Sequence, residues 1–527
     1  MNLLNSIFTS IKEYLSGLIK IILTKSSNHT NYDLTSPEIN FYINISTTIV
    51  GVSLILIIFA FLVNLIAHFF FNVNNYINKK YFFFNMFILL LLIFLMTLKL
   101  YLSLKFEKVV GSSIYEIKST FYSNNVGINH IEYYAVFSST LSDAVTILCL
   151  ITGFVCLDLL GNKSLFKSYN NMLIFLLFNF FVIIMVSTPN LLLMFLSFEC
   201  IFLPTIYFVF ELGYMKKTEK AGIALFYWTL CGSFLILCCL GYLYYNYSTL
   251  NYTMLSKLKF SQTENILFLA IFMIGFGVKI PVIPFHFWLL KVHVEAPTGF
   301  SIFLSGFLVK SALYCLFMFF NIFNDNQLFY FITVMIFFSL IAASSGLATV
   351  IDIKKLIAWA TIQEMTFMLL FLLFKQTFFI HTCILFIILH GLMSIYMFYL
   401  VDIIQRRYGV RSLQHINGLS LFMPKLVKYI WYLILLFGGF PLSAKFLIEW
   451  NLISLFTNTN MLYLFIFSFL VNFIGAIFFI KHFLVILYGI PKSSEDMDFL
   501  DVQKHESILL NFLVALITLL IILMYII

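Results

Sequence analysis

The sequence predicts an all-α polytopic membrane protein of about 14 transmembrane helices, with two inverted five-helix repeats and broken helices 7 and 12. Hydrophobic residues make up 62% of the 527 positions and charged residues only 10%, a balance that a soluble fold of this length could not bury. Apolar stretches of about 20 residues follow one another almost from end to end. They are continuously apolar rather than alternating, which argues against a β-barrel.

The apolar stretches and their connections define the individual spans. The predicted spans cover residues 46–72, 81–104, 136–160, 171–188, 190–212, 221–245, 265–286, 298–322, 328–350, 355–374, 378–401, 425–450, 460–480 and 506–526. Basic residues concentrate in the connections after odd-numbered spans, for example at Lys79, Lys163, Lys216, Lys354 and Arg406. The positive-inside rule therefore predicts that these connections and the acidic 481–505 segment lie on the inner side, with both termini outside.

This pattern divides the chain into five parts. Residues 1–45 form an N-terminal extension, expected to lie in the membrane interface, with a further short span as the alternative. The other parts are helices 1–3 (46–160), a first repeat of helices 4–8 (171–322), a second repeat of helices 9–13 (328–480), and an acidic connection with final helix 14 (481–527). Without a glycine-rich phosphate loop or a long basic stretch, neither a dinucleotide site nor a nucleic-acid partner is expected.

Two prolines follow a lysine near the end of the seventh span. Lys279 stands just before Pro281 and Pro284, and Lys445 follows Pro441 in the twelfth span. Proline interrupts the helical hydrogen bonds, so each lysine is predicted to lie at a helix break inside the membrane. Transporters built from repeated units place their ion sites at such breaks, and the repetition five spans apart predicts two repeats.

Ionisable side chains inside the predicted spans suggest a polar axis through the membrane. They are Glu199, Lys279, Lys310, Glu364, His381, His390, Lys445 and Glu449, with an interfacial role expected for His381 near its span end. Because a charge in hydrocarbon is costly, such groups are expected to face one another or water. The alternatives are a static Glu199–Lys279 pair that only fixes packing, and a Lys310 that extends to the interface. Asp143 and Lys99 are expected to have structural or interfacial roles.

Cysteines and phenylalanines are interpreted as packing residues. The eight cysteines lie in apolar runs without a C-x-x-C pair, so no metal or iron–sulfur site is expected. The 66 phenylalanines are expected to face lipid or neighbouring helices rather than form a functional stripe. Phe, Ile, Asn, Lys and Tyr share A/T-rich codons, and their frequency indicates an A/T-rich organelle genome.

Several segments resemble the antiporter-like membrane subunits of respiratory NADH:ubiquinone oxidoreductase (complex I), a family shared with multisubunit cation/proton antiporters. The resemblance covers roughly residues 170 to 450. The segments that carry it are Gly277 to Pro297, Phe198-Glu-Cys to Pro204, Asp352 to Thr361, Leu389-His-Gly and Gly439-Phe-Pro-Leu. The pattern differs at Leu290, usually proline, at Gln363-Glu364, often Ser-His, and at Lys445, where several relatives have glutamate.

The resemblance implies a proton path with Glu199 and Lys279 as the coupled pair. Lys310, His390 and the charge on helix 12 (Lys445) would carry the central axis, with Glu364 as a relay position. No cofactor would bind this chain, because NADH, FMN, iron–sulfur clusters and ubiquinone would bind other subunits. Its partners would be the other membrane subunits, especially sister chains 2 and 5, and lipids of the mitochondrial inner membrane. The competing readings are an Mrp-type cation/proton antiporter subunit and a structural subunit that has lost transport.

Overall fold

The structure is a computed structural model that describes ten stretches of the chain. They are residues 37–70, 79–110, 114–117, 136–158, 169–212, 218–323, 326–372, 377–456, 462–490 and 501–526. The predicted interfacial extension and the acidic connection therefore lie largely outside the described residues.

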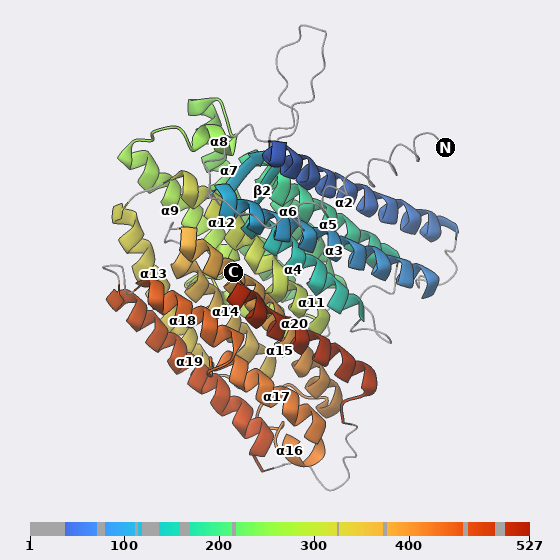
Figure 1. Cartoon of the computed structure of the whole chain (residues 1–527). Helices are drawn as coiled ribbons and strands as arrows, with labels where there is room; N and C mark the ends of the chain where they lie inside the picture. Colours follow the sequence, from blue (N-terminus) through green and yellow to red (C-terminus); the bar gives the residue numbers. More distant parts are fainter. Residues whose placement is uncertain are drawn as a thin grey trace.

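Long helices that share a common direction make up the described structure (Figure 1). Each predicted span overlaps one helix or a series of two or three helical segments. The helices of the first half are α2 (Pro37–Phe70), α3 (Lys79–Val110), α4 (Thr140–Asp158), α5 (Tyr169–Ser187), α6 (Leu191–Leu212), α7 (Thr218–Tyr247), α8 (Tyr252–Leu255), α9 (Gln262–Lys279), α10 (Phe287–Glu295), α11 (Thr298–Phe303), the π-helix η1 (Leu304–Leu308) and α12 (Val309–Ile322).

The second half repeats the pattern of long helices with one interruption. Its helices are α13 (Asn326–Ala348), α14 (Ile353–Leu372), α15 (Thr377–Tyr408), α16 (Leu419–Phe422), α17 (Pro424–Phe437), α18 (Ala444–Phe456), α19 (Leu462–Tyr488) and α20 (Lys504–Ile526). The predicted breaks are present, because one separates α9 from α10 and the other separates α17 from α18. The predicted all-α class is therefore confirmed for most of the described chain.

The structure corrects several of the predicted boundaries. Strand β1 (Ile114–Ile117) pairs antiparallel with β2 (Val136–Ser139), so the third helix begins at Thr140 rather than at residue 136. Helix α10 occupies a segment that was predicted as a loop after span seven. Helix α15 continues to Tyr408 because its end is polar and hydropathy detects only the apolar part of a helix. Helix α19 continues to Tyr488 through the apolar residues that follow Lys481 and His482, where the predicted span had ended.

Two segments form the enclosed centre of the bundle. The most apolar 18 residues of the continuous segment Thr298–Ile322 are all buried, as is 89% of the most apolar part of Thr382–Tyr408. In α2, α3, α7 and α20 the corresponding share is 33%, so these helices lie at the periphery. Within the described residues, eight helices are long and apolar enough to cross a membrane and three more are shorter apolar helices. The count of fourteen spans remains a prediction.

Connections between the helices meet at two separate ends of the bundle. Asn190 bridges to Asn251, which joins the connections after spans four and six. Asp352 bridges to Ser412, and Ile353 N–H donates to Arg411 O at 3.0 Å, which joins the connections after spans nine and eleven. Connections after even-numbered spans thus bond to one another, and so do connections after odd-numbered spans. This is required if successive spans cross the membrane in opposite directions.

Candidate functional site

The first helix break exposes the end of α9 and places a lysine there. Residues 280–286, which include Pro281 and Pro284, separate Lys279 from the start of α10. The Trp288 indole N–H crosses the break and donates to Val278 O at 2.7 Å. The Lys279 side chain is completely buried, so its ammonium needs a partner inside the protein.

Glu199 of α6 supplies that partner. The Lys279 ammonium donates to Glu199 Oε1, and the two residues form an ion pair across 80 positions of sequence. The two side chains differ in exposure, because Glu199 is 29% exposed and Lys279 is not exposed at all. The pairing predicted from the sequence is therefore present in the structure, and its carboxylate reaches the outer surface of the described chain.

Lys310 lies directly after a π-helix in the enclosed centre. The five residues of η1 follow α11, and the Lys310 ammonium donates to the backbone carbonyl of Ser305 inside that turn. A π-helix turn carries an extra residue, so it leaves carbonyls available to other donors. Lys310 is completely buried, which contradicts the alternative that its side chain extends to the interface.

His390 of α15 lies where this helix packs against η1 and α4. Gly391 and Gly306 let these helices approach closely. A Cβ on Gly391 would lie 3.3 Å from Gly306 O and 2.5 Å from Leu148 Cδ2, and a Cβ on Gly306 would lie 2.5 Å from Thr152 Cγ2. Any larger residue would have to displace Leu148, Thr152 or the adjoining backbone. The His390 ring is buried, and its Nδ1 has no hydrogen-bond partner among the described residues.

The second helix break holds a lysine between two carboxylates. The Lys445 ammonium lies 2.6 Å from Glu364 Oε1 of α14 and 3.7 Å from Glu449 Oε1 on its own helix. It also donates to Phe437 O, the last carbonyl of α17, at 2.9 Å. A positive charge at this position favours the negative end of the α17 dipole. All three ionisable side chains are buried.

Glu449 is a site residue that the sequence prediction did not assign to the proton path. Its Oε1 accepts from the Asn472 amide at 3.3 Å, and the Gln363 amide donates to Asn472 Oδ1 at 2.7 Å. It was predicted only as a member of the polar axis, and its position four residues after Lys445 places both side chains on one helix face. The Gln363-Glu364 pair, where the expected Ser-His is absent, thus supplies both an amide and an acid to this cluster.

A further buried ion pair lies away from these clusters. The Lys99 ammonium of α3 contacts Asp143 Oδ1 of α4 at 2.7 Å, and both side chains are almost completely buried. The pair joins two neighbouring helices. This burial contradicts an interfacial role, and the structural role expected for these residues stays a prediction.

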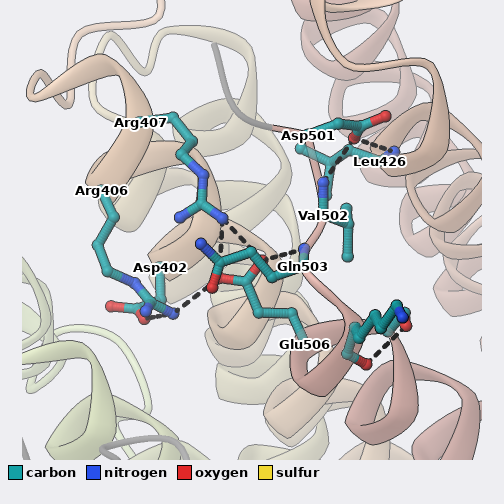
Figure 2. Close-up of polar contacts among 10 residues, drawn as sticks. Asp402, Arg406, Arg407, Leu426, Asp501, Val502, Gln503 and Glu506 are labelled. Carbon is teal, nitrogen blue, oxygen red and sulfur yellow. Dashed lines mark hydrogen bonds and ion pairs between the residues drawn. The ribbon is translucent and has the colours of Figure 1, made fainter. Parts of the chain in front are cut away.

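An ionic network closes the predicted inner end of the bundle (Figure 2). Arg407 at the end of α15 contacts Glu506 at the start of α20 at 2.7 Å, and Arg406 joins Glu506 to Asp402. Asp402 also accepts from the Thr298 hydroxyl, at the start of α11. The network therefore ties the beginning of the Lys310-bearing segment to the end of the His390-bearing helix and to the last helix.

The arrangement brings the predicted site residues into three clusters. One holds Glu199 with Lys279, the second holds Lys310 in the enclosed centre near His390, and the third holds Glu364 with Lys445 and Glu449. No direct hydrogen bond or ion pair between described residues joins one cluster to the next. Chemically, each cluster can hold and release a proton, because each contains a group that titrates in water.

Comparisons with known proteins agree with the family resemblance found in the sequence. The family model described as "NADH:quinone oxidoreductase/Mrp antiporter, TM" matches residues 188–475. The chain is 34% identical over 360 residues to NADH-ubiquinone oxidoreductase chain 4 of Paramecium tetraurelia, covering 68% of this chain and 76% of that protein. It is 28% identical over 400 residues to NADH-quinone oxidoreductase subunit M of Rickettsia felis, covering 75% and 78% of the two chains.

Two solved structures share the fold at lower identity. A chain of the membrane-bound sulfane sulfur reductase, an archaeal respiratory membrane complex, matches with a TM-score of 0.71 and 20% identity over 89% of this chain and 76% of that one. A chain of the Mrp complex from Dietzia sp. DQ12-45-1b matches with a TM-score of 0.70 and 16% identity over 85% and 82%. By the family match over more than half of its length and the identity to the Paramecium chain, this protein belongs to the NADH:quinone oxidoreductase/Mrp antiporter transmembrane family.

Proposed function

We propose that this chain is a proton-translocating membrane subunit of NADH:ubiquinone oxidoreductase, corresponding to chain 4. One observation carries the proposal: each of three buried lysines lies at an interruption of a transmembrane helix and has an acceptor there. Lys279 pairs with Glu199, Lys310 with the Ser305 carbonyl, and Lys445 with Glu364. Charges in hydrocarbon are costly and usually serve transport.

The proposed mechanism starts at the Glu199–Lys279 pair. Two charges about 7 Å apart couple by roughly 2.4 kcal/mol at an effective dielectric constant of about 20, which changes a proton affinity by nearly two orders of magnitude. A movement of Glu199 by a few ångströms would thus switch Lys279 between holding and releasing its proton. Lys310 and His390 would pass protons along the enclosed centre to Glu364, Lys445 and Glu449.

The chain itself would contribute no redox chemistry. We place NADH, FMN, the iron–sulfur clusters and ubiquinone in other subunits, whose reaction would drive the movement of Glu199. The surface around Glu199 supports a neighbouring membrane subunit there, chain 2 or chain 5. The partly exposed carboxylate is surrounded on α6 by exposed apolar side chains, namely Leu193, Leu196 and Leu203. A covering protein would shield the carboxylate from lipid.

Composition supports a mitochondrial inner membrane location. Residues with A/T-rich codons are frequent, as is expected for an organelle genome. The curated relatives named chain 4 point to the same assembly, and the bacterial subunit M is a related component.

The first experiment is to find the assembly that contains this chain. Native membranes would be solubilised gently, separated by size, and the chain located by mass spectrometry beside NADH oxidation activity. Co-migration with a very large NADH-oxidising assembly is expected. A small assembly without that activity, which exchanges cations for protons in vesicles, would instead establish the Mrp-type antiporter.

The second experiment tests the site. Lys279→Ala and Glu199→Gln complexes would be reconstituted in vesicles, and proton uptake would be compared with NADH oxidation in the same preparation. The expected result is a large loss of protons moved per NADH, while the oxidation measured in uncoupled vesicles remains. Lys481→Ala, at an exposed position of α19, is the matched control and should pump normally. Unchanged pumping in Lys279→Ala would instead indicate a structural subunit that has lost transport.

A further inference from the structure

The buried ammonium of Lys279 lies against phenylalanine rings as well as against Glu199. Its Nζ is 4.3 Å from the ring centroid of Phe198, 4.6 Å from that of Phe202 and 5.7 Å from that of Phe195. A cation within about 6 Å of an aromatic ring face is attracted by the ring electrons. All three rings are buried, so water does not weaken the attraction.

The rings and the carboxylate occupy one face of α6. Residues 195, 198, 199 and 202 follow the three- and four-residue spacing that places side chains above one another on a helix. The same helix surface therefore presents two kinds of partner to one ammonium. The second helix break contains a similar contact, because Lys445 Nζ lies 4.5 Å from the ring centroid of Phe437.

The difference in exposure shows which partner can leave. Glu199 is 29% exposed, so a rotation of its side chain can carry the carboxylate towards the outer surface of α6. Lys279 is completely enclosed, and Phe198 and Phe202 are packed against it with 0% and 3% exposure. If Glu199 turned outward, the enclosed ammonium would remain against the ring faces.

We propose that Phe198 and Phe202 form an aromatic cage that holds protonated Lys279 while Glu199 is turned away. They are positioning residues for proton transfer, because they act through the lysine. The alternative is that the rings only fill space between α6 and α9. The inference rests on the proposed function, in which Lys279 gains and loses a proton.

The cage has a measurable consequence for pH dependence. One buried cation–π contact is strong enough to change a proton affinity about tenfold. Losing one ring would therefore make Lys279 release its proton more readily, and pumping would fail at a lower pH. The titratable groups that face Lys279 are Glu199 from α6 and the Cys315 thiol from α12, and both are unchanged in the variants below.

The test compares ring-removing and ring-retaining variants in assembled complex. Protons moved per NADH would be measured in vesicles across a range of pH for Phe198→Leu, Phe202→Leu and Phe202→Tyr. The control is Phe208→Leu, which removes a similarly buried ring of α6 that contacts Tyr207 and Phe300. Each leucine variant of the cage should lower the pH of half-maximal pumping by about one unit. Phe202→Tyr and Phe208→Leu should retain the wild-type profile.

Several results would overturn the cage. It fails if both cage variants keep the wild-type pH profile, or if Phe208→Leu shifts the profile as far as they do. If one leucine variant does not assemble, the other and the tyrosine variant decide the question. Lys279→Ala separates this inference from the proposed function: normal pumping there refutes the function, whereas lost pumping with unshifted leucine profiles refutes only the cage.

Discussion

Replacing Lys445 by methionine removes the charge that two buried carboxylates share. At an effective dielectric constant of about 20, the 2.6 Å contact with Glu364 corresponds to about 6 kcal/mol of attraction and the 3.7 Å contact with Glu449 to about 4 kcal/mol. These values are opposed by the desolvation of all three groups. The net cost of breaking a buried pair on one side is about 3–5 kcal/mol, because a charge is left without its partner.

Three variants separate stability from transport at this cluster. Lys445→Met should lower the temperature at which the isolated complex loses NADH oxidation. Glu364→Gln should lower this temperature less, because Lys445 still has Glu449 and the Phe437 carbonyl as partners. The double variant replaces the closer ion pair by an uncharged one and should recover at least half of the loss. Pumping should remain low in the double variant, because no lysine is left to carry the proton.

The assay combines thermal inactivation, native gel electrophoresis and proton uptake on one preparation. Lys481→Met, an exposed lysine of α19, serves as the control for removing a lysine from a membrane helix. The reasoning is refuted if the double variant is as heat-labile as Lys445→Met. It is refuted as well if Lys445→Met retains the stability and pumping of the wild type.

Other contacts give predictions of the same kind. Lys99→Met and Asp143→Asn should each cost about 3–5 kcal/mol in thermal stability, because each leaves a buried charge without its partner. The double variant should recover most of this loss and pump a normal number of protons per NADH. Lost pumping would contradict a structural role. Gly475→Ala places a Cβ 2.1 Å from Gln363 Oε1 and should cost about 1–3 kcal/mol by heat inactivation, whereas an unchanged temperature would show that Gln363 moves freely. Asp501→Ala removes the acceptor of two N–H groups at the start of α17 and should cost about 1 kcal/mol, while Asp501→Asn should keep most of the stability.

The helix breaks could be predicted from sequence because their cause is local. Pro281, Pro284 and Pro441 cannot continue a helix, and the prediction needed only their positions beside lysines. The burial of Lys279 and Lys445 followed from the apolar residues around them. The sequence also placed Glu449 on the polar axis, and its spacing of four residues from Lys445 on a helix explains why the two side chains meet.

Contacts between distant segments could not be predicted in the same way. Glu364 and Lys445 lie 81 positions apart, and no local pattern states that α14 and α18 meet. The contact of Phe198 and Phe202 with Lys279 was missed because 66 phenylalanines share the same apolar surroundings in the sequence. The strand pair β1 and β2 was missed for a related reason, because hydropathy does not distinguish a short apolar strand from the first turn of a span.

The π-helix before Lys310 affects how this chain is aligned with its relatives. A regular α-helix turns about 100° per residue, so one extra residue in the turn rotates every later side chain by about that angle. A helical wheel drawn through residues 298–322 without a break would therefore assign Lys310 and Tyr314 to the wrong face. A relative that lacks the π-turn would align correctly only with a one-residue gap inside Leu304–Leu308. That gap, rather than any substitution, would mark the extra residue that makes the Ser305 carbonyl available to Lys310.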